Sequence, residues 1–252
     1  ENLKQLLLVA PVEHRIVLGF DPAFRTGCKL AVVDERGKVL ATGVVYPTEP
    51  HNRVDEAKRT IKALIAKYGI NMIALGNGTA SRESEKFLRE LISELDHKID
   101  YVIVNEAGAS VYSASPLGTK EFPTFDVALR SAVSLARRLQ DPLAELVKID
   151  PKAIGVGQYQ HDMNQKKLGE VLGGVVESVV NSVGVDLNTA SPSLLEYVSG
   201  ISSSLAQSIV SYREANGPFK NREDLLKVNK LGPKAFEQCA GFLRIRNGYP
   251  LD

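Results

Sequence analysis

Three acidic residues stand where their carboxylates could converge on divalent metal ions. Asp21 follows one short apolar run, Glu106 follows another, and Asp126 begins a predicted helix. Mg²⁺ prefers carboxylate oxygen, and such ions activate water and stabilise a leaving oxygen. The three residues are therefore candidate catalytic and Mg²⁺-binding groups of a nuclease-type site.

Each carboxylate also has an ordinary structural explanation. Asp21 precedes Pro22 and suits a turn, while Glu106 suits a solvated loop. Asp126 lies at a helix start, where the helix dipole stabilises any carboxylate. The sequence leaves both explanations open.

A second group of residues suits contact with phosphate. Residues 198–202 and 228–232 share one order: apolar, two residues, apolar, small residue, then a predicted helix. Unpaired N–H groups and the helix dipole favour an anion at such a helix start. The predicted nucleic-acid-binding residues are Gly200, Ser202, Ser203, Lys230, Gly232 and Lys234.

Charge gives these turns little additional attraction for a polyanion. The whole chain of 252 residues has a net charge of +1, and residues 186–246 hold eight basic and six acidic side chains. Backbone amides must therefore supply much of any phosphate contact. The alternative is that one or both hairpins serve only packing.

The cysteines and the hydropathy pattern exclude several classes of protein. Cys28 and Cys239 are far apart and lack the spacing of a zinc site or a local disulfide, which favours a reduced, cytoplasmic protein. No apolar run approaches the ~20 residues that a membrane span needs, so we expect no membrane partner. The 44% hydrophobic and 24% charged content is that of a globular chain.

The first half of the chain alternates strand and helix patterns. Helices are expected to begin near residues 54, 81 and 125, and strands are expected at 16–20, 29–34, 39–46, 72–75 and 101–104. The order β-β-β-α-β-α-β-α predicts one mixed five-stranded sheet with helices on both faces, in an α/β domain. That order is typical of the RNase H-like superfamily.

The second half reads as all-α. A long apolar stripe containing Gly169, Gly173 and Gly174 predicts a buried connecting helix against which another backbone packs closely. Short helices and turns follow it. The predicted divisions are an upstream helical end (1–14), an α/β domain (15–160), the connecting helix (161–185), a hairpin domain (186–246) and a linker (247–252).

Three segments resemble known families. Residues 19–27 (Gly-Phe-Asp-Pro-Ala-Phe-Arg-Thr-Gly) resemble the YqgF branch of the RNase H-like superfamily, and residues 186–246 resemble tandem helix-hairpin-helix domains. Residues 131–160, with Leu-Ala-Arg-Arg-Leu-Gln-Asp-Pro, are similar to the Tex family of bacterial transcription accessory proteins. The last resemblance covers nearly the whole chain.

The resemblance implies a cytoplasmic factor that binds RNA or DNA and works with the transcription machinery. It also implies an upstream helical region, a downstream oligonucleotide-binding barrel, and a YqgF-like domain not established as a nuclease. Two departures bear on catalysis. Ala23 stands where glycine is frequent, and Arg130 follows Asp126 where related resolvases have a second acid. Arg130 could pair with a carboxylate and make a metal unnecessary.

Three functions remain open on the sequence. The first is sequence-independent binding of RNA or DNA backbones through the hairpins, with the α/β domain as a scaffold and no required cofactor. The second is Mg²⁺-dependent cleavage by Asp21, Glu106 and Asp126. The third is a platform for protein partners. The loop 76–79 (Gly-Asn-Gly-Thr) lacks the Gly-Lys-Ser/Thr ending of a nucleotide-binding loop.

Overall fold

The computed structural model describes residues 2–154 and 160–245, which belong to two compact units. Residues 9–145 form one unit, here called the sheet unit, and residues 1–8 together with 146–252 form the other, the helical unit. Residues 155–159, Arg246 and the predicted linker 247–252 lie outside the described residues.

The sheet unit contains the predicted mixed five-stranded sheet, in the order β3-β2-β1-β4-β5. Strand β1 is antiparallel to β2 and parallel to β4, and β4 is parallel to β5. The carboxyl ends of β1, β4 and β5 therefore meet at one edge. The strands are β1 (Val17–Asp21), β2 (Cys28–Val33), β3 (Val39–Val45), β4 (Met72–Gly76) and β5 (Asp100–Val104).

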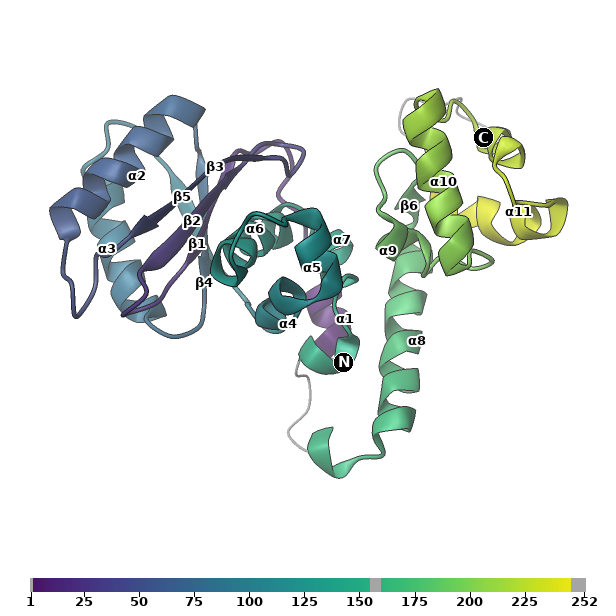
Figure 1. Cartoon of the computed structure of the whole chain (residues 1–252), viewed down its shortest axis with the longest axis horizontal. Coiled ribbons are helices and arrows are strands. Elements are labelled where there is room, and N and C mark those ends of the chain that lie inside the picture. Colours follow the sequence, from purple (N-terminus) through teal and green to yellow (C-terminus); the bar gives the residue numbers. More distant parts are fainter. Residues whose placement is uncertain (1, 155–159, 246–252) are drawn as a thin grey trace. The chain divides into compact units, whose positions relative to one another are not determined.

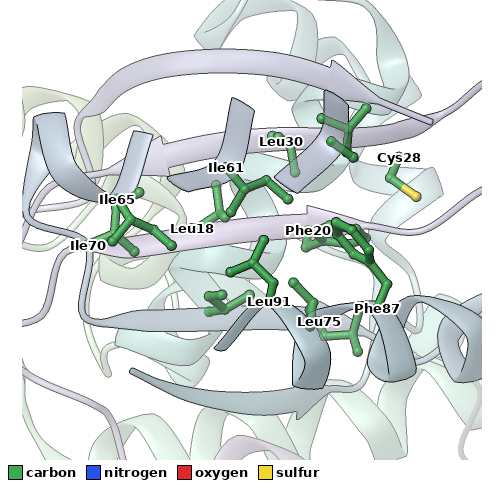
Figure 2. Packing of buried hydrophobic residues seen from close by; sticks show 14 of the residues in the cluster. Leu18, Phe20, Cys28, Leu30, Ile61, Ile65, Ile70, Leu75, Phe87 and Leu91 are labelled. Carbon is green, nitrogen blue, oxygen red and sulfur yellow. The ribbon is translucent and has the colours of Figure 1, made fainter. Parts of the chain in front are cut away.

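Helices cover both faces of this sheet (Figure 1). Helices α2 (Val54–Tyr68) and α3 (Ser81–Ser93) pack on one face, around the apolar cluster drawn in Figure 2. Helix α6 (Val127–Gln140) packs on the other face. The apolar side chains of β1, β2 and β4 alternate between these two clusters, as the two-residue period of a strand requires.

Two local predictions in the sheet unit differ from the structure. Ala80, with φ 64°, is the N-cap of α3, and the predicted cap Ser81 is its first helical residue. The segment predicted as a loop after β5 contains two short helices, because Ser115 ends one and caps the next through Gly118 N–H. The remaining helices here are α4 (Ala109–Ala114), α5 (Pro116–Glu121) and α7 (Pro142–Leu146).

The helical unit is built on α8 (Gln165–Val183), beside α1 (Asn2–Leu7) and the 3₁₀ turns η1 (Pro151–Ile154) and η2 (Gln160–Asp162). The apolar stripe of α8 is buried on one side only. Val171 remains 56% exposed, and no described atom lies within 4 Å of a Cβ at Gly173 or Gly174. The prediction of a helix buried by a close backbone is therefore wrong for this face.

The tandem hairpin module completes the helical unit. Two short strands, which are too brief to show a sequence period, pair in parallel: Val185 with Leu243 and Asp186 with Arg244. The elements are β6 (Val185–Asp186), α9 (Pro192–Leu195), α10 (Ser203–Asn216), η3 (Arg222–Lys227), α11 (Pro233–Cys239), η4 (Ala240–Phe242) and β7 (Leu243–Arg244).

Among the helices that the structure describes, none is both long and apolar enough to span a membrane.

Candidate functional site

Two of the three predicted carboxylates lie together at the carboxyl edge of the sheet. Asp21 ends β1 and Glu106 follows β5. Burial raises the pKa of Asp21 to about 7, and the Glu106 charge adds to this rise while Lys29 opposes it. Because the parallel strands end at the same edge, the chain brings two mutually repelling carboxylates into electrostatic reach of each other.

The loop after β4 accommodates the Glu106 side chain. A Cβ on Gly76 would lie 2.6 Å from Glu106 Oε2, and a Cβ on Gly78 would overlap Glu106 Oε1. Between these glycines, the Oδ1 atom of Asn77 accepts the Glu106 N–H at 3.1 Å. The two glycines therefore leave room for a carboxylate of the protein itself. This role accounts for the glycines of loop 76–79, which lacks the Gly-Lys-Ser/Thr ending of a nucleotide-binding loop.

Asp126 has a separate, local role. It is the N-cap of α6, and its Oδ1 accepts the Leu129 N–H at 2.8 Å. Over the part of the chain that the structure describes, no three histidine, cysteine or acidic side chains form a group suited to a metal ion. Among the described residues Asp126 thus does not join Asp21 and Glu106 in such a group. Asp21 and Glu106 form a pair, called the acidic pair below.

The arginines of α6 contact backbone carbonyls. Arg130 donates to Phe122 O at 3.0 Å and to Ser113 O at 2.9 Å, so the prediction that it pairs with a carboxylate is wrong. Two turns later, Arg138 Nη1 donates to the carbonyls on both sides of Glu106. Sequence reasoning missed Arg138, because periodicity does not separate a buried arginine from an exposed one.

The two hairpin turns have the same geometry, with each residue of the first matched 30 positions later. The Ile201 N–H donates to Val198 O at 3.1 Å, and the Leu231 N–H donates to Val228 O at 3.2 Å. The third residue of each turn is left-handed, with φ 85° at Gly200 and 71° at Lys230. Both are therefore turns that require a positive φ at that position.

The helices that follow these turns begin with backbone N–H groups available for an acceptor. Ser202 caps α10 through the Leu205 N–H at 3.2 Å, which leaves the exposed Ser203 without an intrahelical acceptor for its N–H. Gly232 is the N-cap of α11, at φ −91°, with no side-chain cap bond and nothing within 4 Å of a Cβ there. The first helical residue, Pro233, has no N–H, so the first N–H groups inside α11 are those of Lys234 and Ala235. The backbone of Gly232 does not require glycine, and its small size leaves the start of α11 open.

Most arginines of the module are engaged internally. Arg213, Arg222 and Arg244 donate to backbone carbonyls, and Lys227 pairs with Asp224. Within residues 186–245 the cations that form no ion pair include the exposed Lys230 and Lys234. Although the net charge counted from the sequence is weak, the second turn therefore carries exposed cations that are not neutralised by an ion pair.

We expect Gly200→Ala to destabilise the chain by about 2–4 kcal/mol, from left-handed strain together with overpacking. A Cβ at Gly200 would lie 2.7 Å from Gln238 Cβ. Gly69→Ala is the control, since Gly69 has φ 67° but no atom within 4 Å of a Cβ, and should cost only about 1 kcal/mol. Urea denaturation measures both, and equal losses would show that the first turn does not depend on its contact with α11.

Comparison with known proteins identifies two family models along the chain. The model described as the Tex protein YqgF-like domain matches residues 15–140, half of the chain. The model described as the helix-hairpin-helix motif matches residues 180–244. These ranges contain the acidic pair and both hairpin turns, respectively.

Three curated relatives illustrate the similarity. Protein tex of Bordetella pertussis is 58% identical and Transcriptional accessory protein Tex of Neisseria gonorrhoeae is 56% identical, each over 100% of this chain. S1 RNA-binding domain-containing protein 1 of Homo sapiens is 50% identical over 98% of it. The chain spans 32%, 33% and 25% of the lengths of these three proteins.

Proposed function

The chain belongs to the Tex family, and we propose that its tandem hairpin module binds the sugar–phosphate backbone of RNA or DNA without reading base sequence. The observation that carries this proposal is the pair of equivalent turns, each leading into a helix start with free N–H groups. The exposed Lys230 and Lys234 add positive charge at the second turn. We further propose that the whole factor acts in transcription, in the cytoplasm.

The chemistry of these contacts explains the proposed lack of sequence preference. Backbone N–H groups and lysines bind phosphate oxygens, which are identical at every nucleotide. A module with few free cations contacts few phosphates. We therefore expect modest affinity. The slope of the logarithm of the binding constant against the logarithm of the salt concentration should be about two to three times that of a single phosphate contact.

Ser202 offers a test that separates binding from folding. Ser202→Asp keeps an N-cap acceptor for the Leu205 N–H but places a negative charge where phosphate would approach. Ser202→Asn keeps the same cap without charge. We expect the Asp variant to bind about tenfold more weakly and the Asn variant to bind within about twofold of the parent.

The measurement is fluorescence anisotropy with labelled single- and double-stranded RNA and DNA, each in two unrelated sequences. Equal affinity of the Asp and Asn variants would refute phosphate binding at the first turn. If Lys230→Glu combined with Gly232→Val also left affinity unchanged, the module would be better explained as a platform for protein partners.

A second candidate function is metal-dependent cleavage of nucleic acid, which the closeness of Asp21 to Glu106 favours. We propose instead that the sheet unit is a scaffold, because Asp126 is engaged as a helix cap. Incubation of the same oligonucleotides with Mg²⁺ or Mn²⁺ decides between them. Cleavage by the parent chain that is abolished in Asp21→Asn would overturn the scaffold role.

A further inference from the structure

Glu106 is held in place by contacts from three directions. Its N–H donates to Asn77 Oδ1, and its carboxylate fills the space left by Gly76 and Gly78. The carbonyl groups of the residues before and after it, Asn105 and Ala107, both accept from a single guanidinium nitrogen, at 2.9 and 2.8 Å. Separate contacts therefore hold the N–H of Glu106, its side chain and the carbonyl groups of its two neighbours.

Arg138 supplies that guanidinium from α6. The residue is only 4% exposed, and its Nε and Nη2 atoms have no hydrogen-bond partner among the described residues. Burial lowers the pKa of Arg138, while the charges of Glu145 and Glu106 oppose that shift. Burying a guanidinium with two unpaired nitrogens is unfavourable, and replacing a buried charge by a well-packed apolar side chain is often neutral or stabilising for a protein.

We propose that Arg138 is a positioning residue for the acidic pair: it fixes the backbone on both sides of Glu106 and so keeps the Glu106 carboxylate beside Asp21. Two carboxylates repel each other, and a flexible loop would let them separate. The hydrogen bonds from Arg138 prevent that relaxation. This role does not depend on nucleic-acid binding by the hairpin module.

The test is whether Arg138 controls the interaction between the two carboxylates. Asp21→Asn and Glu106→Gln, alone and together, are compared by urea denaturation at a pH where Asp21 is ionised. In the parent chain we expect the two shifts of the urea midpoint to be non-additive, because either substitution removes the same repulsion. The cycle is then repeated in variants of Arg138.

Arg138→Met keeps an unbranched side chain that can pack in the same apolar surroundings but removes all of its donors, so the non-additivity should be lost. Arg138→Lys, which can still donate to both carbonyls, should restore it. The matched control is Arg130→Met: Arg130 is also buried in α6 and bonded to carbonyls, but to those of Ser113 and Phe122. It should destabilise the chain and leave the non-additivity intact.

Undiminished non-additivity in Arg138→Met would overturn the proposal, and so would its loss in Arg130→Met. If Arg138→Met does not fold, Arg138→Gln replaces it. The glutamine side chain is too short to reach both carbonyls, so non-additivity should be smaller than in the parent. Full non-additivity in Arg138→Gln would contradict the proposal as well.

Discussion

Lys230→Gly is expected to stabilise the chain while weakening its binding to nucleic acid. Lys230 holds a left-handed backbone, φ 71°, at the position that glycine occupies in the first turn. Glycine relieves about 1 kcal/mol of that strain, part of which is offset by the freedom that it adds to the unfolded chain. The same change removes an exposed cation, so the slope of log affinity against log salt should become shallower by about 0.9.

A substitution that raises the stability of the chain but lowers its affinity for nucleic acid marks a binding residue, because loss of a structural residue would lower both. Lys230→Asn is the companion variant, since asparagine tolerates a positive φ and removes the charge. Lys166→Ala removes an exposed cation from α8 and should leave the salt slope unchanged. A Lys230→Gly chain that binds as the parent does would exclude a phosphate contact by this lysine.

Asp21→Asn is expected to stabilise the chain at alkaline pH and to have little effect at acid pH. The pKa of Asp21 rises from 3.8 to about 7 on folding, so between these values the folded state binds more protons than the unfolded state. Stability attributable to Asp21 is therefore fully present below about pH 4 and is lost as the pH rises through 7. Asparagine avoids that loss, which is on the order of 4 kcal/mol for a pKa shift from 3.8 to about 7.

Urea denaturation of the parent chain and the variant at about pH 4 and pH 9 gives the measurement. Asp126→Asn is the matched control, because asparagine also caps a helix and can accept the Leu129 N–H. It should change stability by no more than about 0.5 kcal/mol at either pH. A gain from Asp21→Asn that is the same at both pH values would show that burial does not penalise the Asp21 charge.

Periodicity was sufficient to predict the five strands, their mixed sheet and the main helices, because long regular segments carry a repeating burial signal. It failed for α4 and α5, which are too short to show a period and depend on Ser115 for the break between them. It also failed for the exposed face of α8. An apolar stripe in a sequence shows which residues of a helix are apolar, but not whether another part of the structure covers all of them.

The candidate site was only partly predictable. The order of elements of an RNase H-like fold was enough to expect Asp21 near Glu106, and the parallel pairing of β1, β4 and β5 explains why, since their carboxyl ends coincide. The space that Gly78 leaves for Glu106 and the two carbonyls that Arg138 contacts depend on side chains distant in sequence. The positive φ of Lys230 was also hidden, because lysine itself gives no local signal for that backbone.

The parallel pair β6 and β7 has a mechanical consequence. The Leu187 N–H also donates to Arg244 O, so the chain enters and leaves the hairpin module at bonded neighbours. Tension pulling β6 from its amino end and β7 from its carboxyl end loads this pair in shear. The load passes through the pair before it reaches either turn. Force along the chain therefore loads the turns only once this pair has separated.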